Sequence, residues 1–166
     1  MKAEKEKTMD IRIRKAELKD LDKVVDLAVE MVSHSVSPMR NLPLESIRRF
    51  RREDLESLKH SFPNDSTVIF IAENEAGEFL GHLLVMAGYV ESSTGELQAW
   101  IFDLSVNDEA SRQGVGRALV QKAEEFAAEK GMKYIGLGVT TSNERAIHFY
   151  ENLGYQEERK RMLKTL

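Results

Sequence analysis

The sequence predicts a mixed α/β (α+β) fold, in which a mixed sheet of about six to seven strands is flanked by about four helices in the order β-α-α-β-β-β-α-β-α-β. Two observations lead to this prediction. Three strand-like segments follow one another between residues 66 and 106 with only short turns between them, as in an antiparallel meander. Helical and strand-like patterns then alternate to the end of the chain, which indicates a helical crossover and a parallel pair of strands.

The first part of the chain shows one strand and two helices. Residues 11–16, IRIRKA, alternate apolar and charged side chains, as in a half-buried strand. Residues 18–32 place apolar side chains on one helical face, and residues 44–60 do so with a thinner stripe. We interpret the arginines of this second helix as part of a solvated face: Arg48, Arg49, Arg51 and Arg52.

The middle of the chain contains the meander. Residues 66–73, STVIFIAE, are almost all apolar or β-branched and predict a buried strand. Residues 79–90 return after the turn NEAGE, and residues 97–106 form a third strand after the turn SSTGE. These three segments predict the central part of the sheet.

The last part of the chain predicts a helix, a strand, a helix and a final strand. The first helix runs to Lys130 and ends at Gly131, a residue suited to a helix C-terminus. YIGLGV, residues 134–139, is a buried strand. The next helix begins near Asn143, a good N-cap, and ends at Gly154. We expect a short strand to close the chain.

Composition narrows the class of protein. The 166 residues fit one domain over residues 11–166, preceded by a frayed N-terminal extension over residues 1–10. The absence of cysteine excludes disulfides and a cysteine nucleophile, and the four histidines show no metal-ligand spacing, so no metal is expected. A net charge of −4 argues against a general nucleic-acid binder. No signal peptide or bilayer-length apolar run occurs, so we expect a cytoplasmic protein without membrane contact.

Two glycines at the mouth of a helix suggest an anion site. Gly114 and Gly116 lie between Arg112 and Arg117, directly before the helical pattern. A Walker A loop is absent, and the third glycine of a dinucleotide fingerprint is missing. Glycines let the backbone approach an anion, and the first N–H groups of the helix point at it. A diphosphate fits such a site; alternatively, the glycines only begin the helix.

Two segments together resemble the GNAT superfamily of acyl-CoA-dependent N-acyltransferases. The family signature is a strand ending in an apolar-x-Val, a short loop and [QR]-x-x-G-x-[GA] opening a helix; here it is FDLSV-NDEA-SRQGVGRAL. Downstream, SNERAIHFYENLGYQ is similar to the family's Asn, helical Tyr and aromatic-after-Gly pattern. The resemblance is firm over residues 97–156. It implies a splayed sheet and acetyl-CoA as cosubstrate, with no metal.

The resemblance also implies how coenzyme A is bound. The strand before the loop would pair its backbone with the pantetheine arm, and that backbone belongs to Leu104, Ser105 and Val106. Asn143 matches the residue that bonds the pantetheine, and Tyr150 lies beside it. The first [QR] of the motif falls on Ser111, so we expect this diphosphate contact to shift to Arg112 or to rest on backbone N–H groups. The pyrophosphate segment comprises Ser111, Arg112, Gln113, Gly114, Val115, Gly116 and Arg117.

Acetyl transfer to an amine needs an oxyanion donor, a proton for the leaving thiolate and a neutral amine. The resemblance assigns the first role to the Val106 N–H and the second to Tyr150, whose phenol is protonated at neutral pH. Asp103 acts as the base, orients the acceptor amine, or bonds the backbone as a structural carboxylate. Glu91 and Glu96 are alternative bases, although both flank a turn.

The leading hypothesis is therefore an N-acetyltransferase that moves acetyl from acetyl-CoA to a primary amine by direct attack in a ternary complex. The acceptor is a small molecule or a protein amine, and we expect a monomer or homodimer that binds no nucleic acid and no membrane. One alternative is a catalytically silent CoA-binding sensor or regulatory module, which turnover would distinguish. Another is a nucleotide-binding protein, from which ATP or NAD rather than CoA would displace the ligand.

Overall fold

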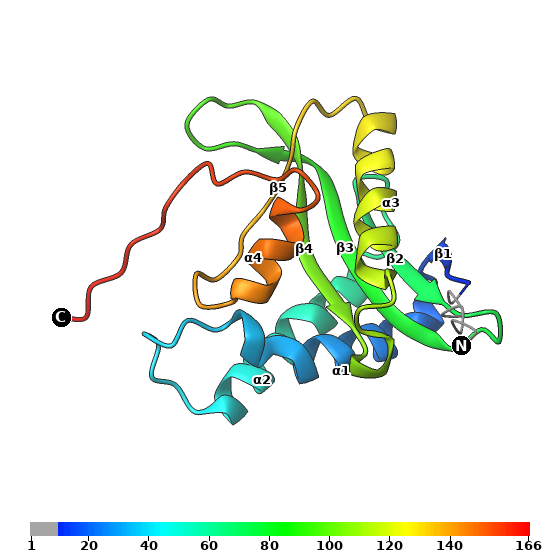
Figure 1. Cartoon of the computed structure of the whole chain (residues 1–166), viewed down its shortest axis with the longest axis horizontal. Coiled ribbons are helices and arrows are strands. Elements are labelled where there is room, and N and C mark those ends of the chain that lie inside the picture. The colour runs from blue at the N-terminus through cyan, green and yellow to red at the C-terminus, as the bar shows by residue number, and fades with distance from the viewer. Residues whose placement is uncertain (1–9) are drawn as a thin grey trace, which may run out of the picture.

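The fold is a five-stranded mixed sheet with helices on both faces (Figure 1). The computed structural model describes residues 10–166, so all but the last residue of the expected frayed extension lies outside the described part. The strands follow the order β1-β2-β3-β4-β5; the first three neighbouring pairs are antiparallel and β4 with β5 is parallel. Their bounds are β1 Arg12–Lys15, β2 Thr67–Glu73, β3 Phe79–Val90, β4 Leu97–Val106 and β5 Ile135–Leu137.

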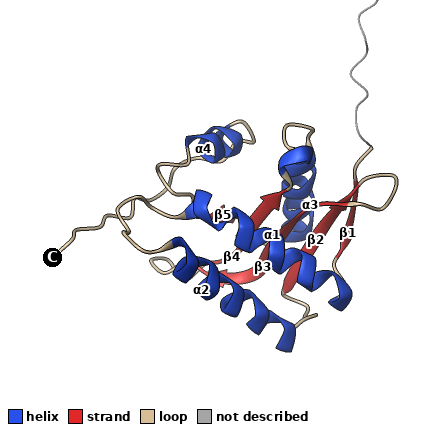
Figure 2. Ribbon diagram, turned by 90° about the horizontal axis from the view of Figure 1, so that it is seen from below, coloured by secondary structure: helices blue, strands red, loops and turns tan. Residues whose placement is uncertain are grey.

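Four α-helices cover the sheet: α1 Leu21–Met31, α2 Leu44–Ser57, α3 Val115–Glu129 and α4 Glu144–Glu151. Figure 2 shows α1 and α2 on one face and α3 and α4 on the other. Two apolar clusters fill the spaces, one between the sheet and α3 and one between the sheet and α1. None of the helices within residues 10–166 is both long and apolar enough to cross a bilayer.

The predicted fold class is confirmed and so is the predicted element order from β1 to α4, but the strand count is lower than expected. The closing strand was a wrong prediction, because residues 155–166 contain no strand and extend away from α4 (Figure 1). The segment from Gln156 to Arg161, QEERKR, carries polar or charged side chains at every position. Such a segment offers no apolar face to bury against the sheet.

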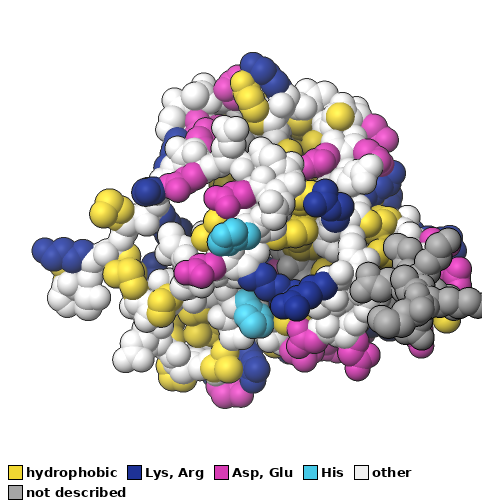
Figure 3. All heavy atoms as spheres, viewed as in Figure 1, with side chains coloured by type: hydrophobic (Ala, Val, Ile, Leu, Met, Phe, Trp, Pro, Cys, Tyr) yellow, Lys and Arg dark blue, Asp and Glu magenta, His cyan; other side chains and the backbone are white. Residues whose placement is uncertain are grey.

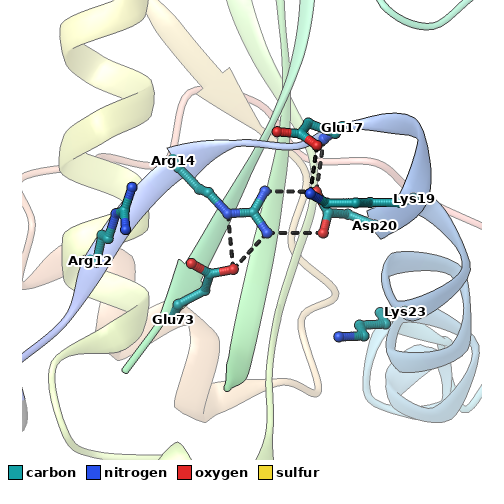
Figure 4. Close-up of a pocket in the computed structure, with 7 residues that line it drawn as sticks. All are labelled: Arg12, Arg14, Glu17, Lys19, Asp20, Lys23 and Glu73. Carbon is teal, nitrogen blue, oxygen red and sulfur yellow. Dashed lines mark hydrogen bonds and ion pairs between the residues drawn. The ribbon is translucent and has the colours of Figure 1, made fainter. Parts of the chain in front are cut away.

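An arginine joins β1 to its surroundings. The Arg14 guanidinium donates from Nη1 and Nη2 to the two carboxylate oxygens of Asp20, at 2.6 and 2.9 Å. Its Nε and Nη2 also donate to Oε1 of Glu73 on β2, at 2.9 and 2.6 Å (Figure 4). Asp20 accepts a further bond from the Glu17 backbone N–H at 2.8 Å. These bonds fix the edge strand to β2 and to the start of α1.

Candidate active site

The sheet opens between β4 and β5. The two strands pair only through Ala99–Ile101 and Ile135–Leu137, whereas β4 continues to Val106 alongside β3. The β3–β4 register skips Phe102, which is the extra residue of a β-bulge. Beyond the bulge, one edge of β4 therefore faces the opening instead of a neighbouring strand. This is the splay that the family resemblance implies.

Leu104 and Val106 direct their backbone groups into the opening. The Asn107 N–H donates to the Leu80 carbonyl of β3 at 2.8 Å. Successive residues of a strand direct their backbone groups to opposite edges, so those of Val106 and Leu104 point away from β3. Ser105 pairs with β3 instead. Of the three residues predicted to meet the pantetheine, two thus have backbone groups available on the open side.

The glycine segment forms a tight turn into α3. Arg112 has a φ of 64°, which is unusual for a residue with a Cβ, and Gly114 is left-handed with a φ of 87°. Gly114 is the N-cap of α3 and no side chain caps the helix, so its first N–H groups are available to an anion. Arg112 and Arg117 are exposed at this end, whereas Val115 is buried. Gln113 donates back to the Glu109 carbonyl at 2.8 Å.

Gly116 has a packing role in the structure, whereas its predicted approach to a phosphate stays a prediction. A Cβ built at this position would lie 3.3 Å from Cζ and 3.5 Å from Cε2 of Phe149 on α4. The absence of a side chain here therefore lets α4 approach the first turn of α3. Gly116 is thus also required for the packing of α4 against α3, which its sequence pattern did not reveal.

A third arginine reaches the segment from α4. The Arg145 guanidinium donates to the hydroxyl of Ser111, the residue at the family's [QR] position. Figure 3 shows Lys and Arg side chains gathered between α4 and the N-terminal end of α3. Arg145 was not predicted as a site residue, because it lies outside the segment from Ser111 to Arg117 and is not one of the motif positions in SNERAIHFYENLGYQ. Its position places a guanidinium where the motif lacks a long polar side chain.

The side chain of Asn143 connects α4 to the segment after α1. Its Oδ1 accepts from the Ala146 N–H at 3.2 Å and so caps α4, as expected for this residue type. Its Nδ2 donates to the His34 carbonyl at 3.1 Å, and Thr140 donates to the Ser35 carbonyl at 2.6 Å. The loop after α1 is thereby tied to the segment between β5 and α4. The predicted contact of Asn143 with pantetheine stays a prediction.

Tyr150 is half-buried on α4. Its ring packs edge-on against Phe149 and Tyr155, with centroid distances of 5.0 and 5.5 Å. Burial and, to a smaller extent, the negative charge of Asp103 raise the pKa of Tyr150 above its ordinary value. The phenol is therefore protonated at neutral pH, as a proton donor to a thiolate must be.

Asp103 is the centre of a polar cluster. Its Oδ1 accepts from Nη2 of Arg51 at 2.7 Å, and its Oδ2 lies 2.6 Å from Nε2 of His82. Ser105 donates to the same Oδ2 at 3.2 Å. Burial raises the pKa of Asp103, but contact with His82 and with Arg51 lowers it by more, so the pKa lies below its usual range. Arg51, His82, Asp103 and Ser105 are called the Asp103 cluster below.

Sequence analysis missed two members of this cluster. His82 is fully buried on β3, and its distance of 21 positions from Asp103 gave no motif. Arg51 belongs to the arginine run that we interpreted as solvated, yet its side chain is only 21% exposed. The two candidate bases besides Asp103 lie elsewhere: Glu91 bonds Arg159 at 2.8 Å, and Glu96 is exposed beside the same turn.

Comparison with known proteins agrees with this geometry. The sequence profile of the Acetyltransferase (GNAT) family matches residues 34–155. The chain is 30% identical over 107 residues to the Escherichia coli K12 protein named [Ribosomal protein bS18]-alanine N-acetyltransferase, covering 62% of this chain and 71% of that protein. It is 32% identical over 131 residues to the Bacillus subtilis N-acetyltransferase YhfO, which is described as uncharacterized, covering 75% and 83% of the two chains.

Solved structures give the same result. A Pyrococcus furiosus protein described as an acetyl transferase superposes with a TM-score of 0.78 at 30% identity, covering 95% of this chain and all of that chain (100%). An aminoglycoside acetyltransferase from an uncultured soil sample shares the fold with a TM-score of 0.67 at 21% identity, covering 94% and 96% of the two chains. Sequence profile, relatives and fold agree: this chain belongs to the acetyltransferase (GNAT) family.

Proposed function

We propose that the protein moves acetyl from acetyl-CoA to a primary amine, by direct attack of the amine in a ternary complex. The observation that carries the proposal is that two features suited to coenzyme A belong to the same strand–loop–helix unit. The open edge of β4 at Leu104 and Val106 is followed directly by the uncapped end of α3. A backbone edge can accept an extended ligand arm like an added strand, and a helix N-terminus attracts phosphate.

The residues fit coenzyme A in two places. The pyrophosphate would lie at the segment from Ser111 to Arg117, bound by backbone N–H groups and by Arg112, Arg117 and Arg145. The pantetheine would pair with the open groups of β4, near Asn143. Bound in this way, acetyl-CoA supplies a thioester carbonyl to the opening.

Three groups of the chain act on the reacting atoms in this proposal. The Val106 N–H points into the opening and stabilises negative charge that develops on the carbonyl oxygen. Tyr150 donates its phenolic proton to the departing sulfur. Asp103 attracts the acceptor amine, and its lowered pKa argues against a role as the base. Effective bases have a pKa near the working pH, so we assign no side chain as the base: the ammonium releases its proton through water to bulk solvent, and the neutral amine then attacks the carbonyl.

The acceptor is a small-molecule or protein amine. The E. coli relative is named for an alanine of ribosomal protein bS18, so an N-terminal alanine peptide belongs in an acceptor screen beside polyamines, amino sugars and free amino acids. The screen reads thiol release from acetyl-CoA. A cytoplasmic location and a monomeric or homodimeric state stay predictions.

Binding of coenzyme A is the first test. Ligands that bind only the folded state raise its stability by mass action, so millimolar CoA should raise the melting temperature and ATP should not. The absence of a shift with CoA would reject the proposal. A shift with CoA but no turnover across the acceptor screen would favour the CoA-binding sensor instead.

Tyr150→Phe tests the chemistry. The variant keeps the ring packing and removes only the hydroxyl, so the single-turnover acetyl-transfer rate should fall roughly 10²–10⁴-fold. Affinity for CoA should stay within about threefold, because the ring still covers the same surface. A rate decrease of less than about threefold would remove Tyr150 from the acid role.

A further inference from the structure

The two carboxylate oxygens of Asp103 are held in different ways. Oδ2 accepts from His82 and Ser105, which are 0% and 5% exposed and belong to the central strands β3 and β4. Oδ1 accepts only from Arg51 within the described part of the chain. Arg51 comes from α2, outside the sheet. One oxygen is therefore fixed by the sheet, and the other is covered by a side chain that can move independently of it.

His82 acts as a fixed donor. Because the pKa of Asp103 is lowered, Asp103 is a carboxylate at neutral pH, and Nε2 of His82 must donate to it at 2.6 Å. The other ring nitrogen, Nδ1, is buried without a partner among residues 10–166. No proton can leave through that atom to a protein group. His82 is thus a positioning residue that directs the carboxylate, not a relay.

Arg51 is held by single contacts to two carboxylates. Besides its bond to Asp103, its Nη1 donates to Oδ2 of Asp54 at 3.1 Å, one helical turn further along α2. The side chain of Asp54 is 52% exposed, whereas that of Asp103 is 15% exposed. Arg51 can leave Asp103 and still have a carboxylate partner. The carboxylate of Asp103 then keeps its negative charge, and its Oδ1 is free to accept from another cation.

We propose that Oδ1 of Asp103 is the binding position of the acceptor's ammonium group, and that Arg51 occupies this position until the acceptor displaces it onto Asp54. The inference rests on the proposed function and adds to it the place where the amine is recognised. Asp103 lies three residues before Val106 on the same strand, so an ammonium bound there is close to the open edge of β4.

Three aromatic side chains pack together on β3 and β4, beginning at the residue next to Asp103. Phe102, the bulged residue next to Asp103, is 44% exposed and packs edge-on to Tyr89 at 5.9 Å. Tyr89 stacks on Trp100 at 5.0 Å. Aromatic faces attract cations and cover apolar arms. The group recognised here is therefore a primary ammonium carried on an apolar stem, whereas an anionic acceptor would meet the carboxylate unfavourably.

The test uses ethylammonium chloride as the probe and reads the 13Cγ resonance of Asp103 in protein labelled at aspartate. Arg51→Met removes the competing cation, and we expect half-saturation at an ethylammonium concentration about tenfold lower than in the wild type. Arg52→Met is the matched control, because Arg52 lies on the same helix and pairs with exposed Asp26 at 3.0 Å. It should bind the probe as the wild type does.

Asp54→Asn gives the opposite prediction. Without its outer partner, Arg51 binds Asp103 more persistently, so the half-saturating concentration should rise severalfold above that of the wild type. Asp54 is exposed, so this variant tests the proposal even if Arg51→Met does not fold. Equal binding in all folded variants, or weaker binding in Arg51→Met, would overturn the inference. The titration needs neither CoA nor turnover, so its failure is distinct from a failure of the proposed acetyl transfer.

Discussion

Arg14 and Arg51 each lie between two carboxylates, but they are bound differently. Arg14 donates two hydrogen bonds to Asp20 and two to Glu73 (Figure 4), and its Nη1 also donates to the Lys15 carbonyl at 3.2 Å, so all five of its N–H donors are used. Arg51 makes one bond to Asp103 and one to Asp54, the second at 3.1 Å. Two-point contacts add geometric specificity as well as energy.

The difference relates to position. The Arg14 cluster joins β1, β2 and the start of α1, at the side of the sheet away from the opening. The Asp103 cluster lies where β4 leaves its partner β5. A charge cluster that only supports the fold gains from using every donor, whereas one that receives a ligand needs a bond that can be exchanged. Variants of the two clusters test this distinction, beginning with the largest expected change in stability.

Arg14→Met should cause the largest loss of stability. It leaves the buried carboxylate of Asp20 and the partly buried carboxylate of Glu73 without their shared cation, and removing one partner of a buried pair costs about 3 kcal/mol. Urea denaturation measures the free energy of unfolding. Arg12→Met is the control on the same strand, since the Arg12 side chain is exposed, and it should change stability by less than about 0.5 kcal/mol. Equal effects of the two variants would show that the hydrogen bonds of Arg14 to Asp20 and Glu73 do not stabilise the fold.

The Arg14 cluster should also give the protein an acid-sensitive component of stability. The hydrogen bond from Arg14 lowers the pKa of Asp20 from 3.8 to about 2. A carboxyl whose folded pKa is lowered stabilises the fold above its unfolded pKa, and this contribution is lost as the pH falls through the folded pKa. The difference in unfolding free energy between wild type and Asp20→Asn should be about 2 kcal/mol at pH 6. It should shrink between pH 4 and pH 2; a difference independent of pH would contradict the linkage.

Arg51→Met should cost less stability than Arg14→Met, about 1 kcal/mol. Asp103 keeps its bonds to His82 and Ser105, and water can reach the freed oxygen because the side chain is partly exposed. The measurement is the same urea titration. A loss as large as that of Arg14→Met would mean that Arg51 is a structural partner of Asp103, and it would argue against an exchangeable contact.

The two clusters also show what the sequence could predict. The alternation in IRIRKA predicted β1, and the two halves of the family motif predicted the strand–loop–helix unit and α4, because these signals lie within short segments. Arg51 gave a signal that we misread: it lies four residues after Ile47 and four before Leu55, on the apolar stripe of α2. A charged residue on such a stripe indicates a buried partner.

The remaining features depend on pairing between distant segments. The bulge at Phe102 and the opening beside it arise from the register between β3, β4 and β5, which no local pattern encodes. The contact between His82 and Asp103 follows from that register, because His82 is opposite Ser105 and Asp103 is two residues away on the same strand face. The predicted closing strand is absent because the charged segment after Tyr155 does not pair with the sheet.

Ser105→Ala should give the smallest effect and the finest test of how Oδ2 is held. The Ser105 hydroxyl donates to Oδ2 at 3.2 Å, a long bond for a hydroxyl, whereas His82 contacts the same oxygen at 2.6 Å. Removing the hydroxyl should therefore cost about 0.5 kcal/mol of unfolding free energy. Because His82 still directs the carboxylate, ethylammonium should bind Ser105→Ala and the wild type with the same half-saturating concentration. A shift as large as that expected for Arg51→Met would show that Ser105, and not His82, fixes the orientation of Asp103.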